Sequence, residues 1–528
     1  MNSIANINHN IVSRLHETIE FNQIESLINR YNTELQCIKE LSNNVLNSDS
    51  KTALTYFLQA KKCDLYGSIE DLFEIDAAAK ILNTDYWRKL FNLTDIFRYM
   101  PQSRREKWDE QIDKNECPVF EREIVYHNLE VLLSQRYKFF AERVSGVFFK
   151  LSGEHVTNRP EGFSKRMIYN FAYYSRYGLD VNTTCAGYLA DLRMIIHKLC
   201  GIENRIVKEG HDRYSAAKIM AICAEETGVW HEIDGGLMKI KAFKKGTMHI
   251  EIASDIAILL NEILGSMYPT AIPAKFRTRN KGRSLEKIFK DRTEKFDNLI
   301  PSIVIEKLIE ANRSQRKVRI RSTMGEANRS LIEILKAVGG KSGSEPSEYI
   351  FDYNIENVLN KIILSGMMPD KKSHQFYSTP ESLAKKLIVM AGIETHHRCL
   401  EPSAGTGSLA RQMNRNTLCI EFSSLNCLVM KEKGLNVINE DFLKFSSKEK
   451  FDRICMNPPF FRGSYKPHVF KAIKLLKEGG RLAAILPSNA IAEIKEELES
   501  CKSFVFSDPI ENAFNDANVT VRILVVEA

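Results

Sequence analysis

Apolar residues recur every three or four positions over much of the first third of the chain. From Ile11 to Leu46 this spacing continues with few Gly or Pro residues, and it predicts a long helix or a helical hairpin. Further amphipathic stretches follow at residues 54–61, 68–82 and 121–150, with prolines between them. The first 150 residues are therefore expected to be mostly helical.

The pattern changes to strict alternation near residue 237. Apolar and polar residues alternate from Leu237 to Phe243 and again from Met248 to Ile252, and Lys244-Lys245-Gly246 supplies a turn between them. This arrangement predicts a β-hairpin, followed by a helix from about Ser254 to Leu264. Residues 1–270 are thus expected to form a separate, mainly helical α+β module.

Strands and helices alternate from residue 346 to the end of the chain, as in a doubly wound α/β domain. Residues 271–345 are expected to connect this domain, 346–528, to the N-terminal module. Within the connecting segment, 304–308 and 331–338 have helical spacing, and the Gly- and Ser-rich residues 339–346 predict a flexible joint.

Basic residues concentrate in this connecting segment. The whole chain has a net charge of +7, whereas residues 271–345 alone hold 18 Lys and Arg against 9 Asp and Glu, an excess of 18 − 9 = +9. A local basic excess is typical of a polyanion-binding surface, although a solvated helix face or linker would look the same. The candidate nucleic-acid contacts are Arg277, Arg279, Lys281, Arg283, Arg316, Lys317, Arg319 and Arg321.

Composition favours a cytoplasmic protein that does not enter a membrane. No run of roughly 18 apolar residues occurs, and the first ten residues lack the basic and apolar regions of a secretory signal. The 11 cysteines are scattered without a Cys-x-x-Cys pair, which indicates buried thiols rather than disulfides. No metal site is expected, because the one His pair, His396-His397, has no Cys or Asp neighbour in the sequence.

A glycine loop is the strongest local signal in the C-terminal domain. An apolar strand end, Cys399-Leu-Glu-Pro-Ser-Ala-Gly405-Thr-Gly407, contains an acidic residue and then Gly-x-Gly, and an amphipathic helix is predicted from about Ser408. Gly405 and Gly407 would let the backbone approach a ligand closely, and a helix N-terminus favours an anionic group. A structural tight turn is the alternative explanation. The predicted strand 418–421 ends in Glu421, at the distance along the chain that suits a carboxylate accepting ribose hydroxyls.

The tetrapeptide Asn457-Pro458-Pro459-Phe460 follows a further predicted strand. An amine conjugated to an aromatic ring is a poor nucleophile, because its lone pair is delocalised. The Asn457 carboxamide oxygen and the Pro458 carbonyl can each accept a hydrogen bond from such an amine. Proline presents that carbonyl rigidly, and Phe460 offers a face on which a flipped base can stack. The motif therefore indicates chemistry on an exocyclic amino group.

Taken in order, these motifs resemble those of the N6-adenine-specific DNA methyltransferases, over roughly Gln375 to Ala528. The resemblance implies a Rossmann-like class I methyltransferase domain and the cofactor S-adenosyl-L-methionine. In that family Asp441 would accept from the cofactor adenine amine, Phe442 would pack on its ring, and the "Tyr/Phe-x-Thr-Pro" motif would pack against the methionine end. The implied cofactor-binding residues are Tyr377, Thr379, Pro380, Glu401, Pro402, Ser403, Ala404, Gly405, Gly407, Glu421, Asp441, Phe442 and Asn457. From the sequence, Thr379 is equally suited to cap a helix that has Pro380 in its first turn.

The N-terminal module is similar to an uncharacterised domain that accompanies such methyltransferases in phage and plasmid proteins. The similarity rests on Trp87-Arg-Lys-Leu-Phe, residues 159–166, the 241–252 hairpin and residues 255–261. It implies a mobile-element setting rather than a chemistry. No target-recognition domain follows the catalytic motifs, so any reading of sequence would fall to this module or to the basic segment.

The interpretation favoured by these patterns is adenine-N6 methylation of double-stranded DNA by an orphan enzyme without a nuclease. RNA adenine, a protein glutamine amide and N4 of cytosine are alternative targets, since each offers a comparable amino group. A non-catalytic nucleic-acid-binding protein that only holds the cofactor is a further alternative. The sequence leaves the target site and the oligomeric state open.

Overall fold

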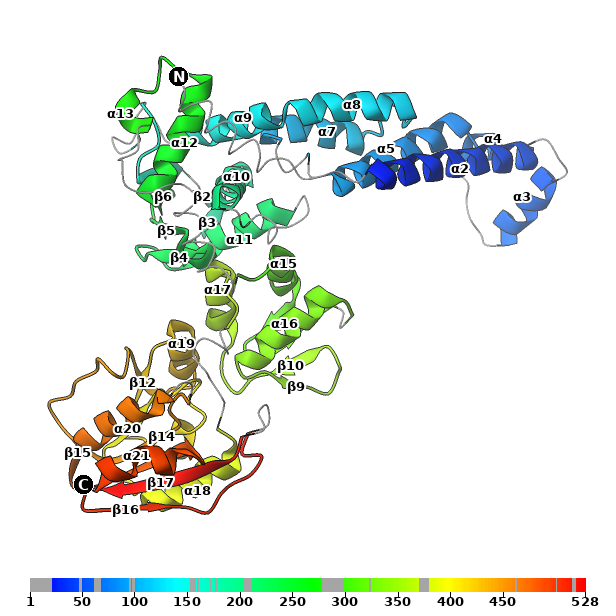
Figure 1. Cartoon of the computed structure of the whole chain (residues 1–528). Coiled ribbons are helices and arrows are strands. Elements are labelled where there is room, and N and C mark those ends of the chain that lie inside the picture. Colours follow the sequence, from blue (N-terminus) through cyan, green and yellow to red (C-terminus); the bar gives the residue numbers. More distant parts are fainter. Residues whose placement is uncertain are drawn as a thin grey trace. The chain divides into compact units, whose positions relative to one another are not determined.

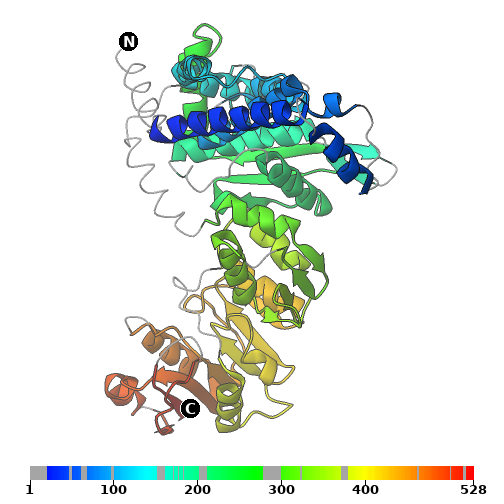
Figure 2. The same cartoon turned by 90° about the vertical axis from the view of Figure 1, so that its right-hand side faces the viewer.

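The chain forms two compact units, residues 1–297 and 298–528. The computed structural model describes residues 21–46, 50–60, 68–94, 96, 100–151, 158, 161–170, 172–175, 178–181, 183–200, 202, 211–277, 299–321, 324–369, 379–460, 463–499, 501–514 and 519–528. Figures 1 and 2 show the two units from two sides. Among these residues no helix is long and apolar enough to cross a membrane.

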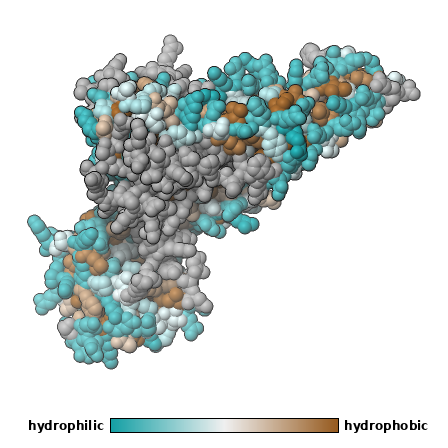
Figure 3. Space-filling view, turned by 45° about the horizontal axis from the view of Figure 1, so that its top comes forward, coloured by the Kyte–Doolittle hydropathy of each residue, from teal (hydrophilic) through white to brown (hydrophobic). Residues whose placement is uncertain are grey.

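The first unit opens with helices, as its sequence predicts. They are α2 (Phe21–Leu46), α3 (Ser50–Ala60), α4 (Ile69–Leu72), α5 (Ile75–Leu93), α7 (Gln102–Asp113), α8 (Arg122–Ser134) and α9 (Arg136–Phe149). The predicted helix 11–46 is confirmed from Phe21 onward, and residues 11–20 lie outside the described part. Helices α2 and α5 lie side by side (Figure 1). Their surface is mostly hydrophilic, with hydrophobic side chains exposed in places (Figure 3).

An aromatic cluster holds these helices together. Tyr31, Trp87 and Phe120 are each at most 1% exposed, and Trp87 Nε1 donates to the carbonyl oxygen of Pro118 across 2.7 Å. The amide oxygen of Asn83 accepts from the Tyr31 hydroxyl at 2.6 Å and from the Phe120 N–H at 3.1 Å. This buried amide oxygen, which accepts two hydrogen bonds, ties α5 to α2 and to the segment that contains Phe120.

A four-stranded antiparallel sheet forms the rest of this unit, in the order β1-β6-β5-β4. Its strands are β1 (Arg166–Asn170), β4 (His231–Ile233), β5 (Met238–Ala242) and β6 (Thr247–Ile252). The predicted hairpin is therefore confirmed as β5 and β6, and the predicted helix after it is α12 (Ser254–Met267). The remaining elements are β2 (Ala172–Ser175), β3 (Gly178–Val181), α10 (Thr183–Cys200), α11 (His211–Glu225) and α13 (Ala274–Arg277).

The second unit begins with a small sheet covered by helices. Its strands are β7 (Asn312–Ser314), β8 (Lys317–Arg319), β9 (Lys341–Ser342) and β10 (Glu348–Ile350), and its helices are α15 (Ser302–Glu310), α16 (Glu326–Ala337) and α17 (Glu356–Ser365). The sheet order is β7-β8-β10-β9, antiparallel throughout. The two helical patterns predicted in the connecting segment are confirmed as α15 and α16.

The prediction of a flexible joint at residues 339–346 is wrong. These residues include β9, and two of their glycines, Gly340 and Gly343, are closely packed. A side chain on Gly340 would place its first carbon 2.7 Å from the Leu335 carbonyl oxygen and 2.8 Å from the Phe351 ring. One on Gly343 would lie 2.4 Å from a carboxylate oxygen of Glu348. Sequence composition does not distinguish this use of glycine from mobility.

A seven-stranded sheet forms the core of the second unit, in the order β13-β12-β11-β14-β15-β17-β16. The strands are β11 (Cys399–Pro402), β12 (Thr417–Glu421), β13 (Asn436–Asn439), β14 (Phe451–Met456), β15 (Leu476–Pro487), β16 (Ser503–Phe506) and β17 (Val521–Glu527). The first five pair in parallel, and only β17 runs antiparallel to its neighbours. This is the predicted Rossmann-like class I methyltransferase fold.

Helices cover both faces of this sheet. They are α18 (Glu381–Ala391), α19 (Ser424–Glu432), α20 (Tyr465–Lys474) and α21 (Ala490–Leu498). Leu400, Ile454 and Leu482 share one face with α20 and α21, whereas Cys455 and Ala483 pack with α18 on the other. The chain order reverses between β11 and β14, so the carboxyl ends of these strands border the crevice at which such sheets bind ligands.

Candidate active site

A cavity of about 360 Å³ lies at the carboxyl ends of β11, β12 and β14. It is lined by predicted residues from five separate motifs. The predicted residues that line it are Thr379, Glu401, Ser403, Ala404, Glu421, Asp441, Phe442, Asn457 and Pro459. Pro380, Pro402, Gly405, Gly407, Pro458 and Phe460 are not among its lining residues, and Tyr377 lies outside the described residues.

The glycine loop makes a tight turn directly after β11. Ser403, Gly405 and Gly407 have φ values of +58°, +57° and +76°, and the Gly407 N–H donates to the Ala404 carbonyl oxygen across 2.9 Å. Ser403 is the one non-glycine residue of the loop that takes the left-handed conformation, which costs energy for a residue with a Cβ. The loop thereby turns its backbone toward the end of β12.

Two expectations for this loop need correction. No α-helix follows it: a single 3-10 turn, η4 (Ala410–Gln412), leads to β12. After this turn Asn414 donates to the carbonyl oxygens of Glu394 and His397. Gly407 serves packing rather than a ligand. A Cβ there would lie 2.4 Å from Leu435 Cδ1 and 3.0 Å from Met430 Cγ.

Glu421 holds the glycine loop in place. One oxygen of its carboxylate accepts from the Gly405 N–H across 2.8 Å, and the other accepts from the Ser423 N–H across 2.7 Å. The side chain is 7% exposed and lines the cavity. A carboxylate oxygen can accept a second hydrogen bond, so this fixed group can also receive hydroxyl donors from a ligand.

Glu401 is the most unusual group in the cavity wall. It is 3% exposed, and its Oε2 is buried without a hydrogen-bond partner among the described residues. Burial raises the pKa of this carboxyl well above its usual range, and the negative charge of Glu421 raises it further. A hydrogen bond from the Ala410 backbone opposes this rise in pKa. A buried carboxyl with one unpaired oxygen favours its neutral form, and a cation or donor that reaches that oxygen favours the charged form. The site therefore has a place for a positively charged or hydrogen-bond-donating part of a ligand.

The opposite part of the cavity combines aromatic surface with a carboxylate. Phe442 is 3% exposed and Phe422 is 64% exposed, and both line the cavity. Asp441 accepts from the Leu443 N–H at 2.9 Å through Oδ1, which orients its carboxylate. The sequence analysis missed Phe422, although its position directly after Glu421 was a signal. Flat apolar surface beside an oriented acceptor suits a heteroaromatic ring that bears an amine.

His468 also lines the cavity, and the sequence analysis missed it. Its Nδ1 lies 2.7 Å from the Ser464 carbonyl oxygen, and its ring centre lies 5.7 Å from that of Phe442, with the two rings tilted by 31°. Burial lowers its pKa. No sequence signal marks it, because α20 is an amphipathic helix in which a buried His resembles any core position.

The tetrapeptide places Asn457 at the cavity wall. Its Nδ2 donates to the Thr379 hydroxyl oxygen across 3.2 Å, which leaves Oδ1 as the acceptor of the carboxamide. The expected helix-capping role of Thr379 is wrong, because α18 is capped by Pro380 without a side-chain bond. Thr379 is 8% exposed and instead orients Asn457.

Phe460 packs outside the cavity. Its ring lies 6.2 Å from that of the buried Phe514 in a T-shaped arrangement, against the core cluster that contains α18. Pro459 lines the cavity, whereas Pro458 is buried. The tetrapeptide therefore connects the cavity to an aromatic surface beside it.

Four of the predicted nucleic-acid contacts lie on or beside β8. Lys317, Arg319 and Arg321 alternate with the buried Val318 and Ile320, so their exposed side chains share one face. Lys317 lies 3.4 Å from Glu348, Arg319 lies 3.0 Å from Glu345, and Arg321 is 80% exposed. Arg316 is exposed as well. The described residues include only the backbone of Arg277 and none of Arg279, Lys281 or Arg283.

Potential metal ligands meet at the amino ends of β11 and β14, away from the cavity. Ligand atoms of Glu394, His396 and His397 lie within 4.8 Å of one another. The sequence analysis overlooked Glu394 as a partner of the His pair. His397 Nδ1 accepts from the Glu394 N–H at 2.9 Å, and burial, followed by the charge of Arg453, lowers its pKa.

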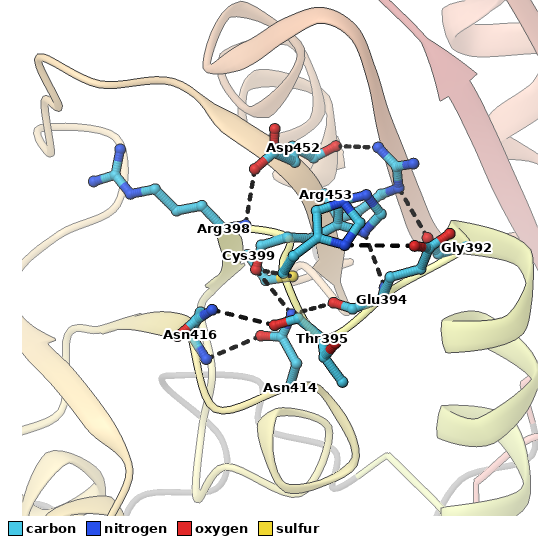
Figure 4. Close-up of polar contacts among 11 residues, drawn as sticks. Gly392, Glu394, Thr395, Arg398, Cys399, Asn414, Asn416, Asp452 and Arg453 are labelled. Atoms are coloured by element: carbon cyan, nitrogen blue, oxygen red, sulfur yellow. Dashed lines mark hydrogen bonds and ion pairs between the residues drawn. The ribbon is translucent and has the colours of Figure 1, made fainter.

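These groups belong to a hydrogen-bonded turn, which Figure 4 shows together with its neighbours. Arg453 donates to the Gly392 carbonyl oxygen, Asn416 donates to that of Thr395, and the Arg398 N–H donates to Asp452. Such a network ties the start of β11 to the start of β14, which is a structural task.

Comparisons with solved structures find similarity to methyltransferases that each cover about a third of this chain or less. A putative RNA methyltransferase from Pyrococcus horikoshii is 20% identical with a TM-score of 0.26, over 30% of this chain and 90% of that one. A dimethyladenosine transferase from Plasmodium falciparum is 20% identical with a TM-score of 0.24, over 29% and 63%. A putative class I S-adenosylmethionine-dependent methyltransferase from Listeria monocytogenes is 12% identical with a TM-score of 0.27, over 30% and 62%.

These similarities concern the fold alone. The chain spans less than two thirds of the Plasmodium and Listeria structures, and no curated protein matches it. The N-terminal unit gives a family match of its own, in agreement with the uncharacterised domain expected there. Residues 79–270 match the family described as "Domain of unknown function (DUF4942)".

Proposed function

We propose that this protein transfers a methyl group from S-adenosylmethionine to N6 of adenine in DNA. The observation that supports this most directly is the Asn457 carboxamide, oriented by Thr379 at the wall of a cavity that also contains Glu401, Glu421 and Asp441. The Asn-Pro-Pro-Phe motif belongs to a family that methylates exocyclic amines, and its adenine-specific DNA members resemble this domain in motif order.

The cavity residues fit the cofactor part by part. Glu401 has an unpaired buried oxygen, which suits the ammonium of the methionine part. Glu421 suits the two ribose hydroxyls, and Asp441 with Phe422 and Phe442 suits the adenine. The volume of about 360 Å³ falls in the usual range for small-molecule sites, roughly 300–1,000 Å³.

When bound, the cofactor supplies a methyl group on a sulfonium, which leaves as a neutral thioether. The protein contributes position rather than a strong base. Asn457 Oδ1 accepts one hydrogen of the adenine N6 amine, and the Pro458 carbonyl accepts the other, so that the nitrogen lone pair faces the methyl carbon. The amine gains the methyl group and releases one proton to solvent. Phe460 offers the base a ring on which to stack.

The adenine must leave the DNA stack to reach Asn457. The exposed basic residues of β8, Lys317, Arg319 and Arg321, are placed in the same unit as the cavity and suit contacts to backbone phosphates. We also propose that the protein acts as an orphan enzyme, without an associated nuclease.

The test is transfer of labelled methyl from S-adenosylmethionine to unmethylated duplex DNA, followed by nucleoside analysis. We expect N6-methyladenine, lost by at least about 100-fold in Asn457→Ala, because acceptors positioned at the reacting group contribute about 3 kcal/mol. Asn416→Ala is the matched control, an exposed asparagine at the far end of the sheet that should keep wild-type activity.

RNA, a duplex of G·C pairs that lacks adenine, and a glutamine-containing protein extract complete the assay. Methylation of RNA but not DNA, or of N4 of cytosine, would overturn the proposed target. Absence of transfer to every nucleic acid, with the cofactor bound, would leave a protein amide or a non-catalytic role.

A further inference from the structure

The four-stranded sheet of the first unit has one buried face and one polar face. Met238, Ile240 and Ala242 of β5 and Met248, Ile250 and Ile252 of β6 are at most 3% exposed, and they form the buried face. The residues between them alternate to the other side of the sheet. None of the active-site residues described above lies there, and the predicted DNA contacts lie elsewhere in the chain.

The strand register arranges this polar face in rows. In the first row Arg166 pairs with Glu251, which pairs with Lys239, which pairs with Glu232. The charges alternate across all four strands. Arg166 forms an ion pair with Glu251, and Lys239 forms one with Glu232 at 2.9 Å. This row is therefore electrically balanced.

The second row has no carboxylate. It begins at the β1 edge with Ile168, which is apolar and buried, and Ile168 lies opposite His249. His249 lies opposite Lys241, and the same register places Trp230 beside Lys241 at the start of β4. The Lys241 ammonium lies 5.8 Å from the centre of the Trp230 ring and 5.4 Å from that of Phe243. The Arg166 guanidinium lies 5.5 Å from the Trp230 ring. Cations and aromatic rings thus alternate along the row and into the next.

The third row and the turn of the hairpin also combine aromatic rings with positive charge. Phe243 and His249 have ring centres 4.4 Å apart, and Asn170 faces Thr247 in the same row. Lys244 and Lys245 are exposed at the turn between β5 and β6. Within the described part of the chain, neither lysine has a carboxylate within 4 Å, and nor does Lys241. The side of the sheet toward the hairpin therefore has an uncompensated positive charge next to three aromatic rings.

We infer that this face binds an unpaired DNA strand, with Trp230 and Phe243 stacking on bases and Lys241, Lys244 and Lys245 neutralising phosphates. Antiparallel sheets that carry aromatic rings among cations are suited to single-stranded nucleic acid, because every base has a π face and every linkage a phosphate. A duplex hides its base faces in the stack. The choice of DNA over RNA rests on the proposed function, whereas the binding itself does not.

The assignment gives the DUF4942 region a task in the enzyme. A methyltransferase that acts on a flipped adenine benefits from a second site that holds strand already separated from its complement. The two sites lie in different units, so the strand would be bound by one unit and modified by the other.

The test uses the full-length chain and a fluorescein-labelled 20-nucleotide DNA strand of mixed sequence, with fluorescence anisotropy as the readout. We expect the strand to bind more tightly than its own duplex. Trp230→Ala and Phe243→Ala should each raise Kd by about 5- to 150-fold, the range for loss of one base stack. Trp230→Phe should keep most of the affinity. Lys241→Ala should also reduce the salt dependence of binding by about one phosphate contact.

Lys239→Ala is the matched control, because Lys239 lies on the same strand but is paired with Glu232. Its Kd should stay within about twofold of wild type, a change in free energy as small as that of losing one exposed ion pair. Thermal unfolding of each variant shows whether the sheet is intact. A fluorescence decrease on binding that is absent from Trp230→Phe would show contact at this ring directly.

The inference is overturned if Trp230→Ala and Phe243→Ala bind the strand as wild type does. It is also overturned if duplex DNA, or RNA of the same sequence, binds more tightly in a Trp230-dependent manner. Cofactor binding and methyl transfer are measured on the same samples. Strand binding without methyl transfer would therefore contradict the proposed function and leave this assignment standing.

Discussion

The carboxamide of Asn457 donates to the hydroxyl oxygen of Thr379 across 3.2 Å, and this bond joins segments 78 residues apart in the chain. One segment follows β14 and the other precedes α18. The bond uses the amide nitrogen, and the amide oxygen is the hydrogen-bond acceptor of the same group. Thr379 is therefore a positioning residue for Asn457 in the proposed reaction.

Thr379→Val should lower the rate of methyl transfer and leave cofactor affinity nearly unchanged. Valine has the shape of threonine without the hydroxyl, so Asn457 loses one partner that fixes its orientation. A neutral hydrogen bond contributes about 0.5–1.5 kcal/mol, which corresponds to roughly a 2- to 12-fold slower single-turnover rate. Thr379→Ser keeps the hydroxyl and should react like wild type. Equal rates for the Val and Ser variants would contradict a positioning role.

Most of what the sequence could predict was local. Strand ends followed by Glu401, Glu421 and Asn457 were visible as short motifs, and parallel strands bring their carboxyl ends to one edge of a sheet. The hairpin of β5 and β6 was visible as alternation around a glycine turn. These elements depend on residues within about ten positions of one another.

What could not be predicted depends on contacts between distant segments. The bond from Thr379 to Asn457 and the entry of His468 into the cavity follow from the packing of α18 and α20 on the sheet. From the sequence, the glycines predict only that another group lies close to the backbone at these positions. For Gly407 that neighbour is the Leu435 side chain, and the sequence could not distinguish it from a ligand.

Gly407→Ala should destabilise the second unit more than Gly434→Ala does. Both glycines have φ of +76°. An alanine at either position therefore adopts a left-handed backbone conformation, which costs about 1–2 kcal/mol in both variants. Only at Gly407 would the new methyl collide, with Leu435 at 2.4 Å, whereas Gly434 has no atom within 4 Å. The excess, about 1–3 kcal/mol, is measured by urea unfolding of the two variants. Equal losses would mean that the loop shifts freely.

Cofactor binding should release a proton from Glu401. Burial holds the pKa of this carboxyl well above its usual range, so without the cofactor the group keeps its proton to a higher pH than an ordinary glutamate does. A bound ammonium beside Oε2 would lower that pKa and ionise the group. Calorimetric titrations in buffers of different ionisation enthalpy count the released protons.

Glu401→Gln is the control for this proton. This variant should bind the cofactor more weakly than wild type does. It should also release fewer protons per bound cofactor than wild type at the same pH. The variant should also be more stable than wild type without cofactor as pH rises above about 4.5. In wild type the unfolded carboxyl ionises there while the folded one keeps its proton, so folding is penalised increasingly at higher pH. An unchanged proton count in Glu401→Gln would place the titrating group elsewhere.

The lowered pKa of Lys433 predicts that the free energy of unfolding increases as the pH rises into the alkaline range. Its ammonium donates to the Thr406 carbonyl oxygen in the glycine loop at 2.8 Å and lies 5.6 Å from the Tyr353 ring centre. Burial, followed by the charges of Arg411 and Lys341, lowers its pKa from 10.5 to about 8. Between these two values the unfolded chain holds a proton that the folded chain has released. Raising the pH removes that difference, so the free energy of unfolding should increase from pH 8 to about 10.5, by up to about 3 kcal/mol.

The measurement is urea unfolding at pH 7.5, 8.5 and 9.5, with Lys433→Met as the control for all other titrating groups. Methionine fills the same space without a charge, so the difference between the two proteins isolates the lysine. Wild type should gain stability relative to Lys433→Met across this range, because deprotonated Lys433 can still donate to Thr406 while its desolvation cost disappears. If the two profiles run parallel, Lys433 keeps its ordinary pKa and the glycine loop is not held by a strained ammonium.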